Sequence, residues 1–210
     1  MSQLFTIHPT HPQLRLIRKA AECLHAGGVI AYPTDSSYAL GCGLGHAEAA
    51  QRIRRIRGID DSHHLTLVVR DLASAGPFTR LDTWQFRLVR LGAPGPYTFI
   101  VPATREVPRR LQHPRRRTVG LRVPDHPVVL ALLAELGEPI LSSTLLLPGD
   151  REPLNDAAVI RERLERQLDA IVDAGPCHAE PTTVVDLDSD PPVITRLGRG
   201  DPARLGLVVG

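Results

Sequence analysis

The stretch "YPTDSSYALGCG", residues 32–43, follows a short apolar run at 29–31 and places a threonine, an aspartate and two serines directly after a proline. Pro33 favours extended backbone at Tyr32, so we expect a strand to end there. Residues 34–37 then offer side-chain and main-chain donors within one turn, and such a turn at a strand end can hold an anion or a small polar ligand. The alternative is a turn whose hydroxyls only cap their own backbone.

Outside this stretch, helix and strand patterns alternate along the chain. Apolar residues recur at helical spacing in "PVVLALLAEL", which Gly137 ends, whereas residues 65–69 form a continuous apolar run of strand length. The predicted helices cover 12–26, 46–57, 82–91, 127–136 and 157–168. The predicted strands cover 29–32, 65–69, 97–101, 118–123, the start of 139–149, 170–172, 183–187 and 193–195. Because helix-separated strands mix with closely spaced ones, the expected fold class is α/β, with an open, mixed parallel and antiparallel sheet that carries helices.

The composition is that of a folded globular protein. Hydrophobic residues make up 42% and charged residues 23% of the chain, and no linker is long enough to divide residues 1–210, so we expect a single domain. The sequence has neither a membrane-length apolar run nor the order of a signal peptide, which favours a cytoplasmic protein with no membrane partner. The formal net charge of +2 is too small for a global polyanion-binding field. Histidines and cysteines lack metal-site spacing, so we predict no metal ligand, and nothing in the sequence fixes the oligomeric state.

Further segments also carry hydroxyls or arginines next to predicted strands. They are "APGPYTFIVPAT" (93–104), "GLRVPDHP" (120–127), "PTTVVDL" (181–187) and "ITRLG" (194–198). Together with the first stretch, and in this order, they resemble the YrdC/YciO family of threonylcarbamoyl-adenylate synthases and relatives over about residues 8–200. The resemblance is closest to the YciO branch, whose "PTDSGYALGC", "PGNYTFIL" and "LSTSLMLPG" are similar to "PTDSSYALGC", "PGPYTFIV" and "LSSTLLLPG" here.

This resemblance implies a fold and a reaction. The fold would be a single YrdC-like domain, a twisted open mixed sheet with helices around a deep, positively charged cavity. The reaction would join ATP, L-threonine and bicarbonate into threonylcarbamoyl-AMP and release pyrophosphate, for later modification of adenosine 37 in tRNA. ATP would be a substrate that enters with Mg²⁺, and no cofactor would stay permanently bound. Fixed arginines and Mg²⁺ suit the charge that adenylation develops on phosphate, and hydroxyls suit a small zwitterion.

The resemblance also implies roles for residues of this chain. Thr34 lies in the loop that would meet the threonine moiety, Arg122 on the wall near the acyl-adenylate, and Arg57 where synthases have a phosphate-facing lysine; these are the catalytic candidates. The other candidates would bind substrate or nucleotide: Ser36, Ser37, Thr98, Ser143, Thr144, Thr182, Thr183 and Arg196. No side-chain nucleophile is required, so catalysis would consist mainly of positioning.

Two segments depart from the synthase pattern. Where synthases carry Lys-x-Arg-Pro, this chain has "RGID", so Ile59 and Asp60 replace the arginine and the proline. Where synthases carry Ser-Ala-Asn, this chain has Thr144, Leu145 and Leu146. A lost charge-assisted hydrogen bond costs about 1.5–3 kcal/mol of binding. Synthase activity and a cavity that binds a different small nucleotide therefore both stay open.

The segment "PRRLQHPRRR", residues 108–117, is the densest basic run. Its arginines are candidates for nucleic-acid binding: Arg109, Arg110, Arg115, Arg116 and Arg117. Such a run can hold the backbone of double-stranded RNA, a partner that older descriptions of the family include. A charge run is more often a solvated face, and no aromatic residue is interleaved here for base stacking. An RNA-binding module is thus the alternative from another functional class.

Overall fold

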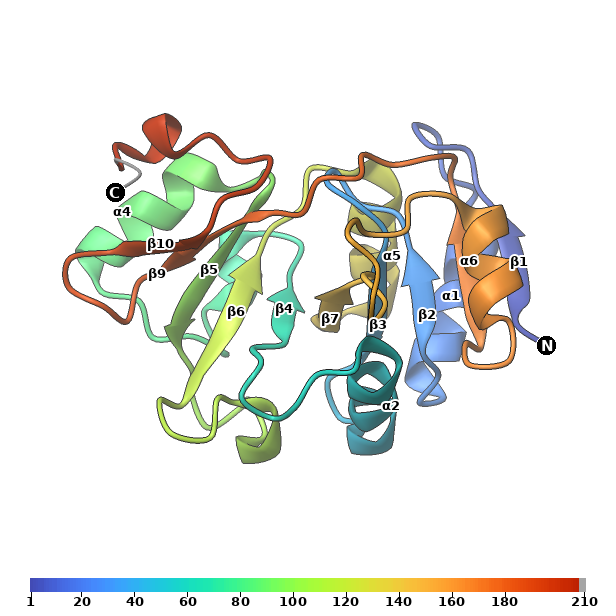
Figure 1. Ribbon diagram of the computed structural model, residues 1–210, viewed down its shortest axis with the longest axis horizontal. Helices are drawn as coiled ribbons and strands as arrows, with labels where there is room; N and C mark the ends of the chain where they lie inside the picture. Colours follow the sequence, from blue (N-terminus) through green and yellow to red (C-terminus); the bar gives the residue numbers. More distant parts are fainter. Residues whose placement is uncertain (208–210) are drawn as a thin grey trace.

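The computed structural model describes residues 1–207 and confirms the predicted fold class (Figure 1). The strands are β1 (Gln3–Thr6), β2 (Ile30–Tyr32), β3 (Ala39–Gly43), β4 (Thr66–Val68), β5 (Tyr97–Pro102), β6 (Thr118–Arg122), β7 (Ile140–Thr144), β8 (Ala170–Asp173), β9 (Thr183–Asp186) and β10 (Val193–Arg196). They form one sheet in the order β1-β8-β2-β3-β7-β4-β6-β5-β9-β10. The pairs β1–β8, β8–β2, β4–β6 and β5–β9 are parallel, and the other neighbours are antiparallel.

Some of the helices begin or end at residues that cap them. The helices are α1 (Leu14–His25), α2 (Ala47–Arg57), α3 (Leu72–Ala75), α4 (Thr83–Gly92), α5 (Pro127–Leu136) and α6 (Ala157–Leu164), with the short 3-10 turns η1 (Arg109–Leu111) and η2 (Pro202–Leu205). Asp82 and Gln85 form a capping box at the start of α4. Gly58 and Gly137 end α2 and α5 in the left-handed region, with φ of 64° and 74°. None of these helices, within residues 1–207, is long and apolar enough to cross a membrane.

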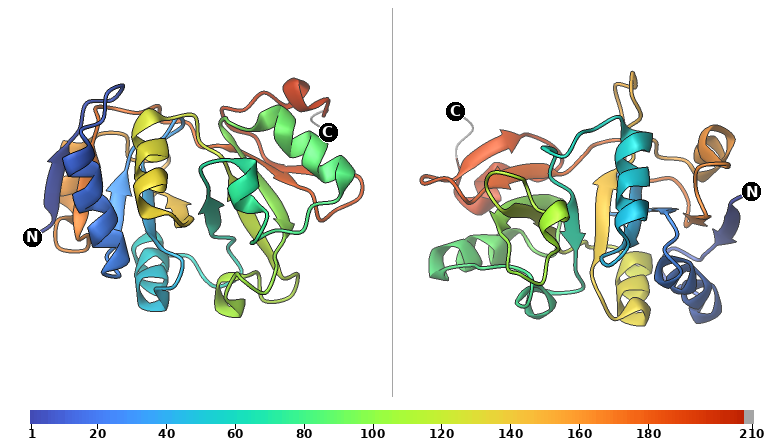
Figure 2. Two further views of the ribbon diagram at one scale, coloured as in Figure 1. Left: turned by 180° about the vertical axis from the view of Figure 1, so that it is seen from behind. Right: turned by 90° about the horizontal axis from the view of Figure 1, so that it is seen from below.

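Strand β5 shows how the alternation of side chains creates an open face. Tyr97 and Phe99 belong to the larger hydrophobic core, on the side covered by α4. A side chain on Gly92, at the end of α4, would come within 2.9 Å of the Phe99 ring, so the glycine permits this close packing. Thr98 and Ile100 point to the opposite face, where a cavity lies. Farther along the sheet, α1 and α5 lie side by side and pack against β2 and β3 (left view of Figure 2).

The sequence pattern does not predict β1 or β3. Residues 39–43, "ALGCG", continue the hydroxyl-rich turn as a fully buried strand, antiparallel to β2 and β7. A side chain at Gly41 would meet Ile140 and Tyr32 at 2.7 Å, so close contacts between strands require a residue of low strand propensity there. Only Phe5 is buried in β1, which leaves this edge strand without a clear pattern. Helix α6 ends at Leu164, earlier than the predicted 168.

Candidate functional site

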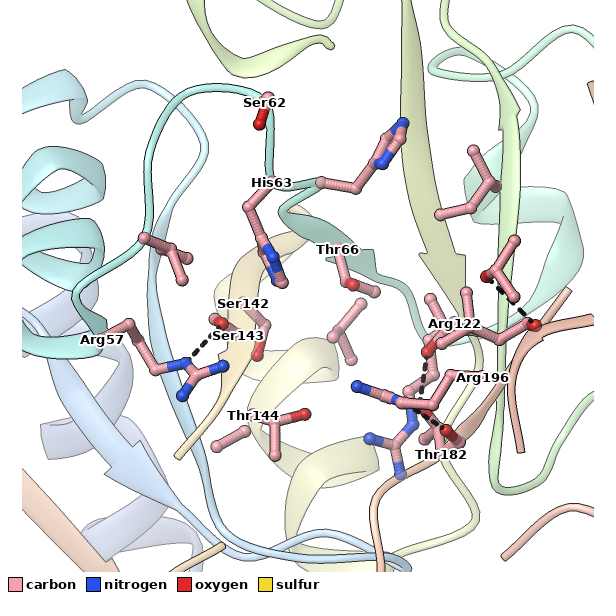
Figure 3. Close-up of a pocket in the computed structure, with 18 of the residues that line it drawn as sticks. Arg57, Ser62, His63, Thr66, Arg122, Ser142, Ser143, Thr144, Thr182 and Arg196 are labelled. Atoms are coloured by element: carbon pink, nitrogen blue, oxygen red, sulfur yellow. Dashed lines mark hydrogen bonds between the residues drawn. The ribbon is translucent and has the colours of Figure 1, made fainter. Parts of the chain in front are cut away.

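A cavity of about 610 Å³ opens on the face of the sheet to which Thr98 and Ile100 point. Its wall is made by consecutive strands of the sheet from β3 to β10, by the end of α2 and by the loop 58–64 that follows this helix. Figure 3 shows Arg57 on one side of the cavity, Arg122 and Arg196 on the other, and His63 between them. Segments that are distant in the sequence therefore converge on one concave surface.

Arg57 and Arg196 give the cavity a positive charge that no carboxylate neutralises. Neither side chain forms an ion pair within residues 1–207, and Arg57 Nε donates only to Ser143 Oγ at 3.2 Å. Burial, together with the charge of Arg196, lowers the pKa of Arg57 to about 10. Burial and the charge of Arg122 lower the pKa of Arg196. Both guanidinium groups are still protonated at neutral pH, so a bound anion would relieve their repulsion.

Arg122 is held in place by the hydroxyl-rich turn. Its Nη2 atom donates to Asp35 Oδ1 at 2.5 Å, to Ser36 Oγ at 3.0 Å and to Thr34 Oγ1 at 3.2 Å. Thr34 Oγ1 also donates to the carbonyl of Ser37 at 2.6 Å and accepts from the backbone of the turn, as in the self-capping alternative. The turn thus caps its own backbone and positions an arginine of the cavity at the same time.

Some of the predicted site residues do not line the cavity. Thr34 and Ser36 accept hydrogen bonds from Arg122 and do not line the cavity, so their placement does not favour the predicted direct contact of Thr34 with a ligand. Thr183 is also withdrawn, because its hydroxyl donates to the carbonyl of Gly200 at 2.6 Å and accepts from the backbone N–H of Gly198. The predicted candidates that do line the cavity are Arg57, Arg122, Arg196, Ser37, Thr98, Ser143, Thr144 and Thr182.

The hydroxyls on the far side of the cavity form a chain with Arg196. Thr98 Oγ1 and Thr182 Oγ1 share a hydrogen bond of 2.8 Å. Arg196 donates from Nη2 to Thr182 Oγ1 at 2.9 Å and from Nε to the Thr182 carbonyl at 3.0 Å. The guanidinium is therefore fixed by two hydrogen bonds while it still faces the cavity, as a preorganised anion-binding group requires.

Two cavity histidines were not predicted as site residues. His63 and His64 come from the loop 58–64, and in the sequence they form an adjacent pair without metal-site spacing, which gives no signal for a cavity. Burial and the charges of Arg57 and Arg196 lower the pKa of His63, so its imidazole is neutral at pH 7. Burial and the neighbouring His113 and Arg116 lower the pKa of His64 to about 4. The His64 ring stacks on His113 with centroids 4.8 Å apart.

Sequence comparison with a family model covers most of the chain. Residues 22–198 match the Sua5/YciO/YrdC model, whose description is "Telomere recombination". The chain belongs to this family. An uncharacterized Escherichia coli (strain K12) family member, YciO, is 50% identical over 96% of this chain and 98% of its own length. A threonylcarbamoyl-AMP synthase of Coxiella burnetii is 30% identical over 81% of this chain and 91% of its own length.

Solved structures of the Sua5/YciO/YrdC family have the same fold. The crystal structure of E. coli YciO superposes with a TM-score of 0.95 and 49% identity, over 98% of this chain and all of that one. The structure of P. abyssi Sua5 complexed with L-threonine has a TM-score of 0.86 at 24% identity, over 94% of this chain and 58% of that one. The similarity to E. coli YciO extends to the sequence, whereas the similarity to P. abyssi Sua5 shows only that the fold is shared.

The departures from the synthase pattern of the family lie partly on the cavity wall. Ile59 and Asp60 line the cavity. Hydrogen bonds from the side chain and backbone of Ser62 lower the pKa of Asp60, which keeps this carboxyl charged at neutral pH. Leu145 is buried in the core and Leu146 is half-buried, and neither lines the cavity. The arginine of the synthase pattern is therefore replaced by the uncharged Ile59, with the negative charge of Asp60 next to it. The asparagine is replaced by Leu146, which does not line the cavity.

The arginines of residues 108–117 do not form one continuous surface. Arg116 turns toward the cavity and makes a bidentate pair with Asp186, at 2.6 and 2.8 Å, and a further pair with Asp188 at 2.9 Å. Arg109 and Arg117 line a second hollow beside it. Arg110 and Arg115 are exposed and line neither. Within residues 1–207, no group of three or more His, Cys, Asp or Glu side chains is arranged to hold a metal ion.

Proposed function

We propose that the protein is a nucleotidyltransferase that binds ATP, L-threonine and bicarbonate in this cavity and forms threonylcarbamoyl-AMP with release of pyrophosphate. The observation that carries the proposal is the convergence of Arg57, Arg122 and Arg196 on one cavity that is otherwise lined by hydroxyls. A volume of about 610 Å³ lies within the range of small-molecule sites. A relative named threonylcarbamoyl-AMP synthase and the complex of Sua5 with L-threonine support the choice of substrates.

The reaction needs positioned charges rather than a protein nucleophile. The threonine amine would attack the carbon of bicarbonate, and loss of water would leave a carbamate. An oxygen of this carbamate would attack the α-phosphorus, the bond to the β-phosphate would break, and pyrophosphate would leave. Arg57 and Arg196 would hold the phosphates, and Arg122, fixed by Asp35, would orient the acyl group.

Mg²⁺ would enter with the nucleotide and stabilise the negative charge of the leaving pyrophosphate. The cavity offers it few carboxylates, since Asp186 is paired with Arg116 and Asp60 accepts two hydrogen bonds from Ser62. Mg²⁺ commonly binds to substrate phosphates and water with only one or two protein ligands. The product would serve the later modification of adenosine 37 in tRNA, a reaction expected in the cytoplasm.

A second candidate function is binding of a different small nucleotide without synthesis. It is favoured by the ionised Asp60 on the cavity wall, next to Ile59, which stands where the synthase pattern has an arginine. A like charge near a triphosphate weakens its binding, whereas a ligand with fewer phosphates would be affected less. Changes in melting temperature across a panel of nucleoside mono-, di- and triphosphates would rank these ligands.

The test of the proposed reaction is release of pyrophosphate from purified protein. Release should require ATP, Mg²⁺, bicarbonate and threonine together and should stop when any one of them is omitted. Arg57→Ala should reduce the rate at least tenfold, whereas Arg55→Ala should not, because Arg55 is exposed on the same helix and does not line the cavity. Equal rates in the three proteins, or release without threonine, would reject the synthase function.

A further inference from the structure

A second hollow, of about 710 Å³, lies beside the cavity and is rich in arginine. It is formed by the connection between β5 and β6, which extends beyond the end of these strands in Figure 1, and by the segment before α4. Five arginines line it: Arg80, Arg105, Arg109, Arg116 and Arg117. The rest of its lining is uncharged and consists of Pro102, Ala103, Thr104 and Gln112.

Backbone hydrogen bonds hold the segments that carry these arginines. The N–H of Arg80 donates to the Pro102 carbonyl at 2.9 Å, and the N–H of Ala103 donates to the Arg117 carbonyl at 3.0 Å. The side-chain amide of Gln112 donates to the carbonyls of Thr104 and Val107 and braces the loop between them. The arginines are thus brought together by the fold itself and do not depend on mutual contacts.

The charge of this hollow is largely uncompensated. Among the described residues, Arg80, Arg105, Arg109 and Arg117 form no ion pair, and the one acidic residue of the connection, Glu106, forms none either. Arg116 is the exception, because Asp186 and Asp188 neutralise it and fix it between the hollow and the cavity. Gathered like charges repel one another, and a bound anion would relieve that repulsion.

Arg117 adds an observation on the backbone. Its φ is +56°, and within residues 1–207 it is the one residue other than glycine with positive φ. An arginine in this region is strained, and such strain is found most often at functional sites. The backbone of Arg117 nevertheless stays there, held by bonds from its N–H to the His113 carbonyl and from the Ala103 N–H to its own carbonyl.

We propose that this arginine hollow binds a compact oligophosphate, an anion with two or three linked phosphoryl groups. The guanidinium group matches phosphate oxygens with two parallel donors, and several of them around one concavity suit several adjacent phosphoryl groups. A duplex RNA would instead need an extended track, and the exposed Arg110 and Arg115 of the same run lie outside the hollow. The anion has two sources, free pyrophosphate or the phosphate tail of a nucleotide.

The experiment measures binding without turnover, so it does not depend on the proposed function. Isothermal titration with pyrophosphate, tripolyphosphate and orthophosphate would use the wild type and the double variant Arg105→Gln/Arg109→Gln. The matched control is Arg110→Gln/Arg115→Gln, which makes the same change of charge in the same segment. We expect a saturable site for pyrophosphate and tripolyphosphate whose affinity is at least tenfold weaker in the first variant and unchanged in the control. Orthophosphate should bind much more weakly than either.

Further titrations separate the hollow from the cavity and identify the source of the anion. With Arg57→Ala, binding at the hollow should persist. A preference for pyrophosphate over ATP would identify the free product as the ligand, and the reverse preference would identify a nucleotide tail. Equal losses in both double variants would show diffuse charge attraction, and loss in Arg57→Ala alone would place the anion in the cavity. Stoichiometric displacement of pyrophosphate by a tighter-binding duplex RNA would also overturn the proposal.

Discussion

Arg122 and Asp35 form the most buried ion pair of the site, with Nη2 and Oδ1 2.5 Å apart and side chains only 8% and 11% exposed. The second carboxylate oxygen of Asp35 and the Nε atom of Arg122 are buried and have no hydrogen-bond partner within residues 1–207. The pair therefore fixes the guanidinium group through Nη2, and its other two nitrogens form no hydrogen bond with Asp35. Removing one partner of such a pair leaves an uncompensated buried charge.

This arrangement predicts that Asp35→Asn destabilises the protein by about 3 kcal/mol, because the charge of Arg122 would stay buried without a counter-ion. Urea denaturation would measure the free energy of unfolding. Asp125→Asn is the control, because Asp125 is exposed and forms no ion pair among the described residues. A loss of less than about 1 kcal/mol would mean that solvent screens the pair as it does on a surface.

Arg196→Ala should weaken binding of the ATP–Mg²⁺ complex about tenfold to a hundredfold, the effect of losing one charge-assisted hydrogen bond. Arg196 is fixed by Thr182 and carries an uncompensated charge toward the cavity. Equilibrium dialysis would give the dissociation constants, with Arg199→Ala as the control on an exposed residue of the same segment. Equal constants for the two variants would exclude Arg196 from nucleotide binding.

Asp60→Asn should strengthen binding of ATP severalfold, since it removes a negative charge from the cavity wall and keeps the size of the side chain. Because Asp60 is exposed to solvent, the gain should shrink as salt is added. Asp61→Asn changes the neighbouring acid, which does not line the cavity, and should have little effect. Tighter binding in both variants would indicate a general effect of net charge rather than a local one.

The stability of the fold should fall in acid through His64. Burial lowers the pKa of His64 from 6.5 to about 4, with His113, Arg116 and His63 acting in the same direction and Asp186 opposing them. The unfolded chain therefore takes up a proton near pH 6.5 and the folded chain only near pH 4, so stability decreases as the pH falls between these values. His64→Gln should flatten the dependence of Tm on pH in this window. The exposed His25→Gln should leave its slope unchanged, and an unchanged slope in His64→Gln would contradict the assignment.

The sequence predicted the arginines of the cavity better than it predicted the strands that carry the opening stretch. The resemblance to the family indicated Arg57, Arg122 and Arg196 as site residues, and short-range patterns indicated only that each lies close to the end of a helix or a strand. Strand β3 was not predicted, because its small residues are required by close contact with β2 and β7, and no local sequence pattern reveals such contact. Long-range packing decided this element against its own propensity.

The roles of the turn residues and of the histidines also depend on distant partners. Thr34 was expected to meet a ligand, yet its hydroxyl is engaged by the turn and by Arg122, a residue far along the chain. His63 faces the cavity because the loop 58–64 folds over it, and a loop of this kind has no periodic pattern that would place it. Residue types alone indicated a polar, cationic site, and tertiary contacts determined which of these residues line the cavity.

The strands that line the cavity, from β3 through β7 and β4 to β10, belong to one hydrogen-bonded sheet, and this has a mechanical consequence. The floor of the cavity consists of strands joined by main-chain hydrogen bonds. A change in the width of the cavity would therefore require these strands to slide past one another. The cavity can therefore accommodate a smaller or larger ligand only through substitution of its side chains or through the loop 58–64 at its rim. Divergence of ligand preference among proteins of this architecture should accordingly be concentrated at that rim.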